Sequence, residues 1–282
     1  MNRRRFLSTT AGISAAGLAS MTGILNGCAA PGGNIDNIGI QLYTIRKMMA
    51  ENMESSLARV AEVGYKEVEF FDYYGRKASE VKNMLDQNGL VSPSIHVDLV
   101  DLYSDNLKKL IDYSSELGQK YITLAWFQES DRQTLDQFKS YVELFHHVGA
   151  ECQKAGITFA YHNHEFEFEA IDGVEPYDLF LENVPADLLA MEMDLYWITA
   201  AGRDPLAYFE KHPGRFHMCH IKDRSAAGDM VYVGDGVIDF NKFLAKASEA
   251  GIKHFFAEHD QPADEGQMMV TSYKSMKNYK IG

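Results

Sequence analysis

The feature that most constrains the fold of this chain is a regular alternation of short apolar runs with longer amphipathic segments. Eight runs have the length of strands; they are residues 38–45, 67–71, 91–97, 121–126, 157–162, 188–194, 216–222 and 254–258. Five amphipathic segments between them end just before a glycine; they are 53–63, 78–88, 106–117, 135–155 and 241–250. Glycine after a helix takes the left-handed capping conformation easily. The alternation predicts an α/β fold, a single (β/α)₈ TIM barrel, with a doubly wound open sheet as the alternative.

Polar and ionisable side chains follow nearly every predicted strand. They are Arg46; Glu69 and Asp72; His96 and Asp98; Trp126 and Gln128; His162, His164 and Glu165; Glu192 and Asp194; His220, Lys222 and Asp223; and Glu258, His259 and Asp260. In a barrel the carboxyl ends of all strands meet at one face, whereas an open sheet needs such groups only at one crevice. This distribution favours the barrel.

Four of these strand ends combine imidazoles with carboxylates. Side chains two residues apart share a face of a strand, which pairs His162 with His164, Glu192 with Asp194, His220 with Lys222, and Glu258 with Asp260. A mixed nitrogen and oxygen donor set suits Mn²⁺, Mg²⁺, Co²⁺ or Zn²⁺. Such an ion can polarise a substrate carbonyl and stabilise an enediolate while a nearby base removes the adjacent proton.

Other candidates have structural interpretations beside the functional ones. Glu69 and His96 are candidate substrate-binding residues, together with Trp126 and Trp197, but Glu69 can also be a core carboxylate and His96 can hydrogen-bond a loop. Lys222 can belong to a surface ion-pair cluster, although its position two residues after His220 favours a functional role.

Residues 1–27 have the pattern of an export signal, with arginines at positions 3–5 followed by small and apolar residues without an acid. The paired arginines indicate a twin-arginine signal, and residues 25–28 resemble a lipobox in which Cys28 becomes the lipidated first residue. We therefore expect an exported bacterial protein, periplasmic or membrane-anchored as a lipoprotein, with a tether at 28–37 and a catalytic barrel at 38–282. An uncut amino-terminal anchor is the alternative.

Charge restricts the partners of this chain. Without residues 1–27 it has 24 basic and 40 acidic residues, a net charge of −16. Such a surface excludes nucleic acid and leaves a lipid anchor as the only expected contact with a membrane. Cys152 and Cys219 are expected to be reduced core residues, and a homo-oligomer is compatible with the sequence.

Taken together, these strand ends resemble the xylose isomerase-like TIM-barrel superfamily of sugar phosphate isomerases/epimerases, inosose dehydratases and endonuclease IV relatives. The resemblance covers residues 37–280. It rests on Val68-Glu69, Tyr161-His162-Asn163-His164-Glu165, Met193-Asp194, His220-Ile221-Lys222-Asp223, the segment 233–240 and Ala257-Glu258-His259.

The resemblance implies a divalent metal held by Asp194, His220 and Glu258 and by a fourth ligand on the fifth strand. That strand commonly carries Glu-Asn-His, where this chain has His162-Asn163-His164, so a histidine replaces the usual acid. Because the 3-epimerases use two glutamates to move protons, a base such as His164 or Glu165 becomes more attractive here. Trp197 stands where endonuclease-like relatives carry a metal-binding histidine, which argues against a trinuclear site.

The resemblance therefore implies a metal-dependent isomerase or epimerase that acts on a small sugar or keto-sugar through an enediolate. Its catalytic candidates are His164, Glu258, Lys222 and Glu165, and its metal ligands His162, Asp194, His220 and Glu258. One alternative is a lyase that cleaves 3-keto-glycosides after the same proton abstraction. The other is a non-catalytic sugar-binding lipoprotein.

Overall fold

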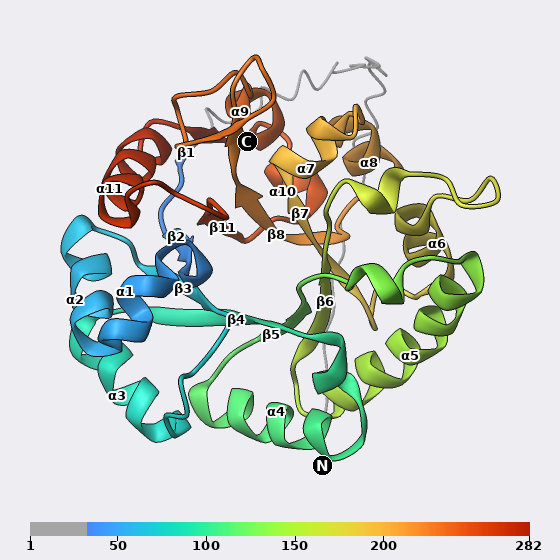
Figure 1. Ribbon diagram of the computed structural model, residues 1–282, viewed down its shortest axis with the longest axis horizontal. Coiled ribbons are helices and arrows are strands. Elements are labelled where there is room, and N and C mark those ends of the chain that lie inside the picture. The colour runs from blue at the N-terminus through green and yellow to red at the C-terminus, as the bar shows by residue number, and fades with distance from the viewer. Residues whose placement is uncertain (1–32) are drawn as a thin grey trace, which may run out of the picture. The chain divides into compact units, whose positions relative to one another are not determined.

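Eight parallel strands close into a barrel in the computed structural model, which describes residues 33–282 (Figure 1). In barrel order they are β11 (His254–Ala257), β2 (Ile38–Gln41), β3 (Glu67–Phe70), β4 (Val91–Val97), β5 (Tyr121–Leu124), β6 (Thr158–His162), β7 (Ala190–Asp194) and β8 (Phe216–Ile221). Each lies within a run that the sequence predicted as a strand, so the single TIM barrel is confirmed. The predicted export signal and Cys28 lie outside the described residues.

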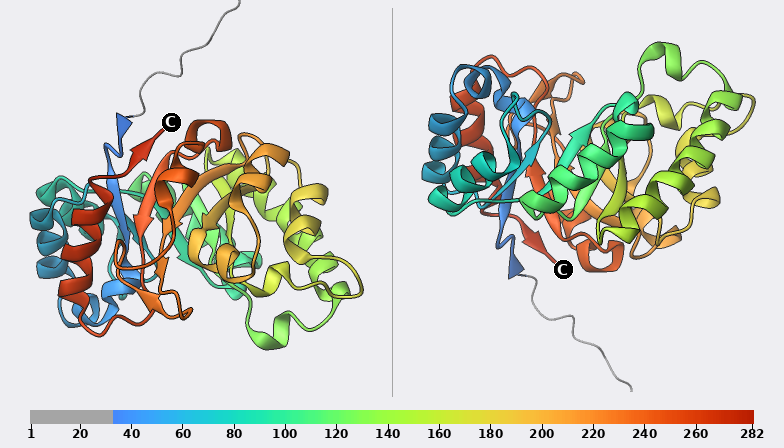
Figure 2. Two further views of the ribbon diagram at one scale, coloured as in Figure 1. Left: turned by 90° about the horizontal axis from the view of Figure 1, so that it is seen from above. Right: turned by 90° about the horizontal axis from the view of Figure 1, so that it is seen from below.

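Helices surround the barrel (Figures 1 and 2). They are α1 (Arg46–Glu51), α2 (Met53–Val63), α3 (Ala78–Asn88), α4 (Ser104–Leu117), α5 (Leu135–Lys154), α6 (Pro176–Asn183), α7 (Leu195–Ala200), α8 (Pro205–Lys211), α9 (Phe240–Leu244), α10 (Ala247–Ala250) and α11 (Glu265–Met276). The predicted helices of α2 and α3 match residue for residue, and those of α4 and α5 within two residues. None of the helices within residues 33–282 combines the length and apolarity needed to span a membrane.

Two predicted elements are wrong in detail. The first strand ends at Gln41 instead of residue 45, because the Gln41 side chain accepts a hydrogen bond from the backbone N–H of Tyr43 and starts a short 3₁₀ helix, η1 (Leu42–Ile45). The predicted helix 241–250 is two helices, α9 and α10. The carboxyl-terminal Gly282 lies at the break, where its N–H donates to the Leu244 carbonyl and its carbonyl accepts from the Ser248 N–H.

An apolar layer crosses the barrel interior beneath the polar groups of the strand ends. It contains Tyr121, Ala160, Ala190, Met218 and Phe256. A Cβ at position 39 would overlap the Phe256 ring, so the glycine there is a packing requirement. Because inward side chains recur every second residue, the polar groups lie above this layer, toward the carboxyl ends of the strands.

The two ends of the described chain pair with each other. Strand β1 (Gly33–Asn34), within the segment predicted as a tether, is antiparallel to β12 (Lys280–Ile281). Both lie on the same side of the domain (Figure 2). Since β1 precedes β2, this pair is at the amino-terminal end of the barrel. Cys152 and Cys219 are buried and free, as predicted, and burial raises the pKa of the Cys152 thiol to about 12.

Candidate metal centre and substrate cavity

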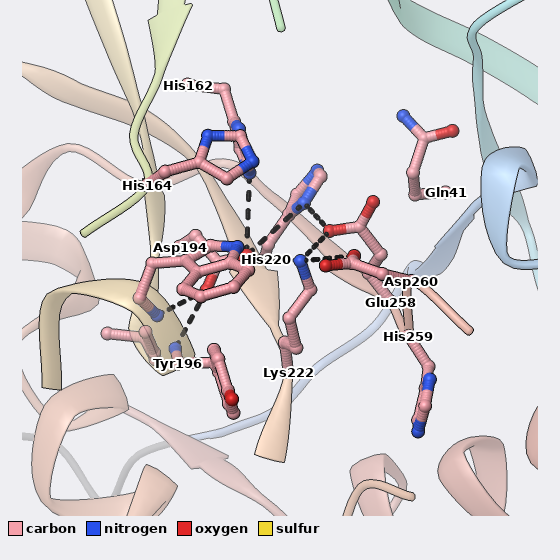
Figure 3. Close-up of polar contacts among 12 residues, drawn as sticks. Gln41, His162, His164, Asp194, Tyr196, His220, Lys222, Glu258, His259 and Asp260 are labelled. Atoms are coloured by element: carbon pink, nitrogen blue, oxygen red, sulfur yellow. Dashed lines mark hydrogen bonds and ion pairs between the residues drawn. The ribbon is translucent and has the colours of Figure 1, made fainter. Parts of the chain in front are cut away.

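Four neighbouring strands bring the predicted metal ligands together. His162 ends β6, Asp194 ends β7, His220 lies near the end of β8, and Glu258 directly follows β11. One donor atom of each lies within 4.8 Å of the donor atoms of the other three. We call these four residues the outer cluster (Figure 3). All four are buried.

The hydrogen bonding of His162 leaves one ring nitrogen free for the centre. Its Nδ1 is 3.1 Å from the carbonyl oxygen of Ala125. A carbonyl only accepts, so Nδ1 carries the ring proton and Nε2 has the lone pair. This Nε2 is buried, has no hydrogen-bond partner among the described residues, and lies 3.4 Å from Asp194 Oδ2. A histidine oriented in this way is typical of metal ligands.

The two carboxylate oxygens of Asp194 have different roles: one caps a helix and the other faces the outer cluster. Its Oδ1 caps α7 by accepting from the N–H groups of Tyr196 and Trp197, at 2.8 and 3.0 Å. The side chain of Asn163 fixes the Asp194 backbone by accepting from its N–H and donating to its carbonyl. Oδ2 points toward the centre of the outer cluster, where it lies 3.4 Å from His162 Nε2 and 3.0 Å from the Lys222 ammonium.

Lys222 provides the positive charge beside these carboxylates. Its Nζ lies 3.0 Å from Asp194 Oδ2, 2.7 Å from Glu258 Oε2 and 2.7 Å from Asp260 Oδ1. Burial alone would raise the pKa of Asp194 and Glu258, but the Lys222 ammonium acts together with His162 and His220 to lower both. The same carboxylates raise the pKa of the buried Lys222 well above its ordinary value, so the ammonium stays charged.

His220 bridges two layers of the barrel interior. Its Nδ1 is 2.7 Å from Glu258 Oε2, and its Nε2 is 2.8 Å from Glu69 Oε2. Glu69 also accepts a hydrogen bond from Gln41. Glu69, predicted to contact substrate, is fully buried beneath the outer cluster and does not line the cavity.

A cavity of about 530 Å³ opens beside the outer cluster. The predicted residues that line it are His96, Trp126, His162, His164, Glu165, Trp197, Lys222 and Glu258. His164 is the neutral base candidate among them. Desolvation, His162 and the Lys222 ammonium hold the pKa of His164 well below its usual range, and its buried Nδ1 has no partner within residues 33–282.

Loop residues that sequence reasoning missed complete the cavity wall; they include Tyr43, Phe71, Asp101, Arg132 and Phe166. The Arg132 guanidinium stacks 3.7 Å from the centroid of the Phe166 ring. Gln41 and Asn163 were also missed as residues that fix site groups. Loop residues have no periodic pattern that could have identified them, whereas the position of Asn163 between two histidines was a usable signal.

Comparison with known proteins identifies the family of this chain. A family model for the xylose isomerase-like TIM barrel matches residues 57–279. No curated protein sequence matches the chain. A sugar phosphate isomerase/epimerase from Parabacteroides distasonis has a similar structure, with a TM-score of 0.72, 26% identity, and 90% of this chain and 96% of that chain covered.

Two further structures share the fold at lower identity. One is a xylose isomerase-like TIM barrel protein from Mycobacterium smegmatis in complex with magnesium, with a TM-score of 0.66, 16% identity, and 85% and 95% of the two chains covered. The other is the probable 3-DHS dehydratase AsbF from Bacillus anthracis, with a TM-score of 0.68, 14% identity, and 86% and 99% covered. The closed barrel and the family match lead to one conclusion: this chain belongs to the xylose isomerase-like TIM-barrel family.

Proposed function

We propose that this protein is a divalent-metal-dependent sugar isomerase or epimerase that removes a proton next to a carbonyl and forms an enediolate. The observation that carries the proposal is the outer cluster, in which two imidazoles and two carboxylates from four strands meet beside a large cavity. The similarity to a sugar phosphate isomerase/epimerase at 26% identity supports this class of chemistry.

The residues present fit a divalent ion. His162 Nε2 is a buried ring nitrogen without a hydrogen bond in the described chain, which is expensive unless something else satisfies it, and Asp194 Oδ2, which pairs with Lys222, lies 3.4 Å from it. His220 Nδ1 and Glu258 Oε2 complete a set of two nitrogens and two oxygens, suited to Mn²⁺, Mg²⁺, Co²⁺ or Zn²⁺. When bound, the ion supplies a Lewis acid that stabilises negative charge on a substrate oxygen.

His164, Lys222 and Glu165 have different roles in the proposed proton transfer. His164 is a neutral imidazole at the cavity wall, and we assign it the removal of the proton next to the carbonyl. Lys222 holds Glu258 and Asp194 in place, and its ammonium is the nearest permanent positive charge for the developing enediolate. Glu165, also at the wall, is the second candidate base.

This arrangement differs from a pair of equivalent carboxylates. Glu258 Oε2 lies 2.7 Å from both His220 Nδ1 and Lys222 Nζ, so this oxygen is already engaged and is not free to take a proton from a substrate. On the fifth strand His162 replaces the acid. One base and one fixed cation suit a reaction in which the proton leaves from one face of the substrate.

A second candidate function is a lyase that eliminates the aglycone from a 3-keto-glycoside after the same proton abstraction. The observation in its favour is the cavity. Its volume of about 530 Å³ lies in the range of pockets for drug-sized ligands, ~300–1000 Å³, and Tyr43, Phe71, Trp126, Phe166 and Trp197 give it aromatic walls. Such walls suit a second ring beside the sugar.

The deciding experiment is incubation of the metal-loaded protein in D₂O with ketoses, aldoses and 3-keto-glycosides, followed by NMR and mass spectrometry. Deuterium incorporation without bond cleavage supports the isomerase or epimerase, and release of the aglycone supports the lyase. If no carbonyl sugar exchanges a proton although metal is bound, the proposed chemistry is wrong.

Matched variants connect the outcome to the site. Glu258→Gln should lose at least 100-fold in exchange rate, an order-of-magnitude expectation for a metal ligand or its neighbours. Glu67→Gln is the control, because Glu67 is also a buried strand glutamate bonded to a histidine, His254, at 2.8 Å, but at the opposite end of the barrel. Equal losses in both variants would mean that folding, and not the site, is being measured.

A further inference from the structure

A second group of buried side chains lies beneath the outer cluster and shares only His220 with it. Glu69 of β3, His96 of β4, Glu192 of β7 and His220 of β8 each offer one donor atom, and these atoms lie within 4.8 Å of one another. We call them the inner cluster. Glu69, Glu192 and His220 are fully buried, and His96 is 7% exposed.

The carboxylates of the inner cluster are paired with imidazoles, whereas those of the outer cluster are paired with a lysine as well. Lys222 pairs with Asp194 and Glu258, but within residues 33–282 no lysine or arginine pairs with Glu69 or Glu192. The Oε1 atom of each is buried and makes no hydrogen bond in the described chain. The two carboxylates face His96 and His220, and each keeps one buried oxygen that no hydrogen bond satisfies, a cost that a cation between them would remove.

We propose that the inner cluster is a second divalent-metal site, with Zn²⁺ as the preferred ion. Two imidazole nitrogens and two carboxylate oxygens are a donor set that tetrahedral zinc accepts. The charge of the ion would balance Glu69 and Glu192, and the full burial of three of the four ligands is typical of a closed, structural zinc site.

The distances in the inner cluster are close to what such an ion requires. His96 Nε2 lies 2.6 Å from Glu192 Oε2 and 3.2 Å from Glu69 Oε2. His220 Nε2 lies 2.8 Å from Glu69 Oε2 and 3.4 Å from Glu192 Oε1. A tetrahedral ion with bonds of ~2.1 Å holds its donors ~3.4 Å apart. Each of these four pairs lies within 1 Å of that separation, and the Oε1 atoms, which make no hydrogen bond in the described chain, leave the carboxylates free to rotate.

His220 connects the two sites through opposite ring nitrogens. Nδ1 faces Glu258 in the outer cluster, and Nε2 faces Glu69 and Glu192 in the inner cluster. With an ion in each cluster, His220 would release both ring protons and bridge the ions as an imidazolate, which would fix the plane of its ring and the direction of Nδ1. The inner ion would thus be a structural support for the outer, catalytic one.

Metal stoichiometry tests the proposal on the purified, full-length protein. The protein is stripped with a chelator, reloaded with Zn²⁺, freed of excess ion and analysed by inductively coupled plasma mass spectrometry. We expect two ions per chain in the wild type, one in Glu192→Gln and one in Asp194→Asn. The control Glu67→Gln should keep two. Diffraction at the zinc edge on wild-type crystals locates each ion without relying on a variant.

The outcomes separate the second site from the proposed function. One ion in the wild type, lost in Asp194→Asn and kept in Glu192→Gln, overturns the inner site, whose carboxylates would then be balanced by protons on the imidazoles. One ion lost in Glu192→Gln and kept in Asp194→Asn supports the inner site and overturns the outer one. A wild type without zinc overturns the inner site, and a wild type that also binds no Mn²⁺, Mg²⁺ or Co²⁺ overturns the outer one. If Glu192→Gln fails to fold, His96→Gln replaces it.

Discussion

Replacing Lys222 by methionine should reveal how far the outer cluster depends on positive charge. The ammonium is 1% exposed and lies within 3.0 Å of Asp194, Glu258 and Asp260. Methionine keeps most of the volume of the side chain and removes only the charge and the hydrogen bonds. Three carboxylates then remain close together without their lysine.

The expected loss of stability is large when no metal is present. Removing one partner of a buried ion pair destabilises proteins by ~3–5 kcal/mol, because an uncompensated charge stays behind. This range applies to Asp194 and Glu258 because their side chains are buried, with 0% and 6% exposed. We therefore expect the unfolding free energy of Lys222→Met in a chelator to fall by about 3–5 kcal/mol.

A divalent ion should restore part of this loss. Binding to the folded state alone stabilises a protein by ~2.7 kcal/mol at an ion concentration 100 times Kd. Because the ammonium and the ion both favour the same carboxylates, removing Lys222 should make the stabilisation by Mn²⁺ larger than in the wild type. Urea unfolding followed by circular dichroism, in chelator and in Mn²⁺, measures both effects.

An exposed lysine provides the control for this experiment. Lys246 pairs with Glu249 at 2.7 Å, but their side chains are 54% and 43% exposed, so Lys246→Met should keep the urea midpoint of the wild type. Equal urea midpoints for Lys222→Met and the wild type in chelator would refute the reasoning. The reasoning would also be refuted if Mn²⁺ stabilised Lys222→Met and the wild type by the same amount.

Three further predictions concern other parts of the molecule. Burial raises the pKa of Glu167 to about 8, above its ordinary value, so the stability that it contributes is complete at low pH and is lost as the pH rises toward 8; relative to Glu167→Gln, the wild type should lose about 2 kcal/mol between pH 6 and pH 8, and parallel pH profiles of urea unfolding would contradict this. Gly39→Ala should destabilise the barrel by ~1–3 kcal/mol, because the new Cβ would overlap Phe256 and approach the Phe255 carbonyl oxygen at 3.1 Å. Gly33→Ala is the control and should keep the stability of the wild type, because nothing lies within 4 Å of its Cβ. Equal melting temperatures of the two variants would count against the packing argument. Cys28→Ser should abolish incorporation of labelled fatty acid in the native host, and unchanged labelling would rule out lipidation at that residue.

The barrel strands were predictable because their signals are local. Each of the eight has an apolar run of its own, and the glycines after α2, α3 and α4 end the preceding helices with positive φ. The break between α9 and α10 had no local signal, because it depends on Gly282, more than thirty residues further along the chain. Contacts at such separations cannot be read from periodicity.

The site was predictable to the extent that it follows strand alternation. The pattern placed His162, Asp194, His220 and Glu258 on inward faces, where the structure has them. The depth of each side chain depends on the register between strands, which alternation does not give. Glu69 therefore lies beneath the cavity instead of in its wall, and Arg132 reaches the wall from a loop.

The pairing of β1 with β12 determines how the barrel would be oriented on a membrane. Cys28 is five residues before Gly33, and five extended residues reach at most ~18 Å. A lipid on Cys28 would therefore hold the domain close to the bilayer by its amino-terminal face. The cavity opens at the opposite, carboxyl-terminal face, so it would point away from the lipid headgroups and receive substrates that diffuse in the aqueous compartment.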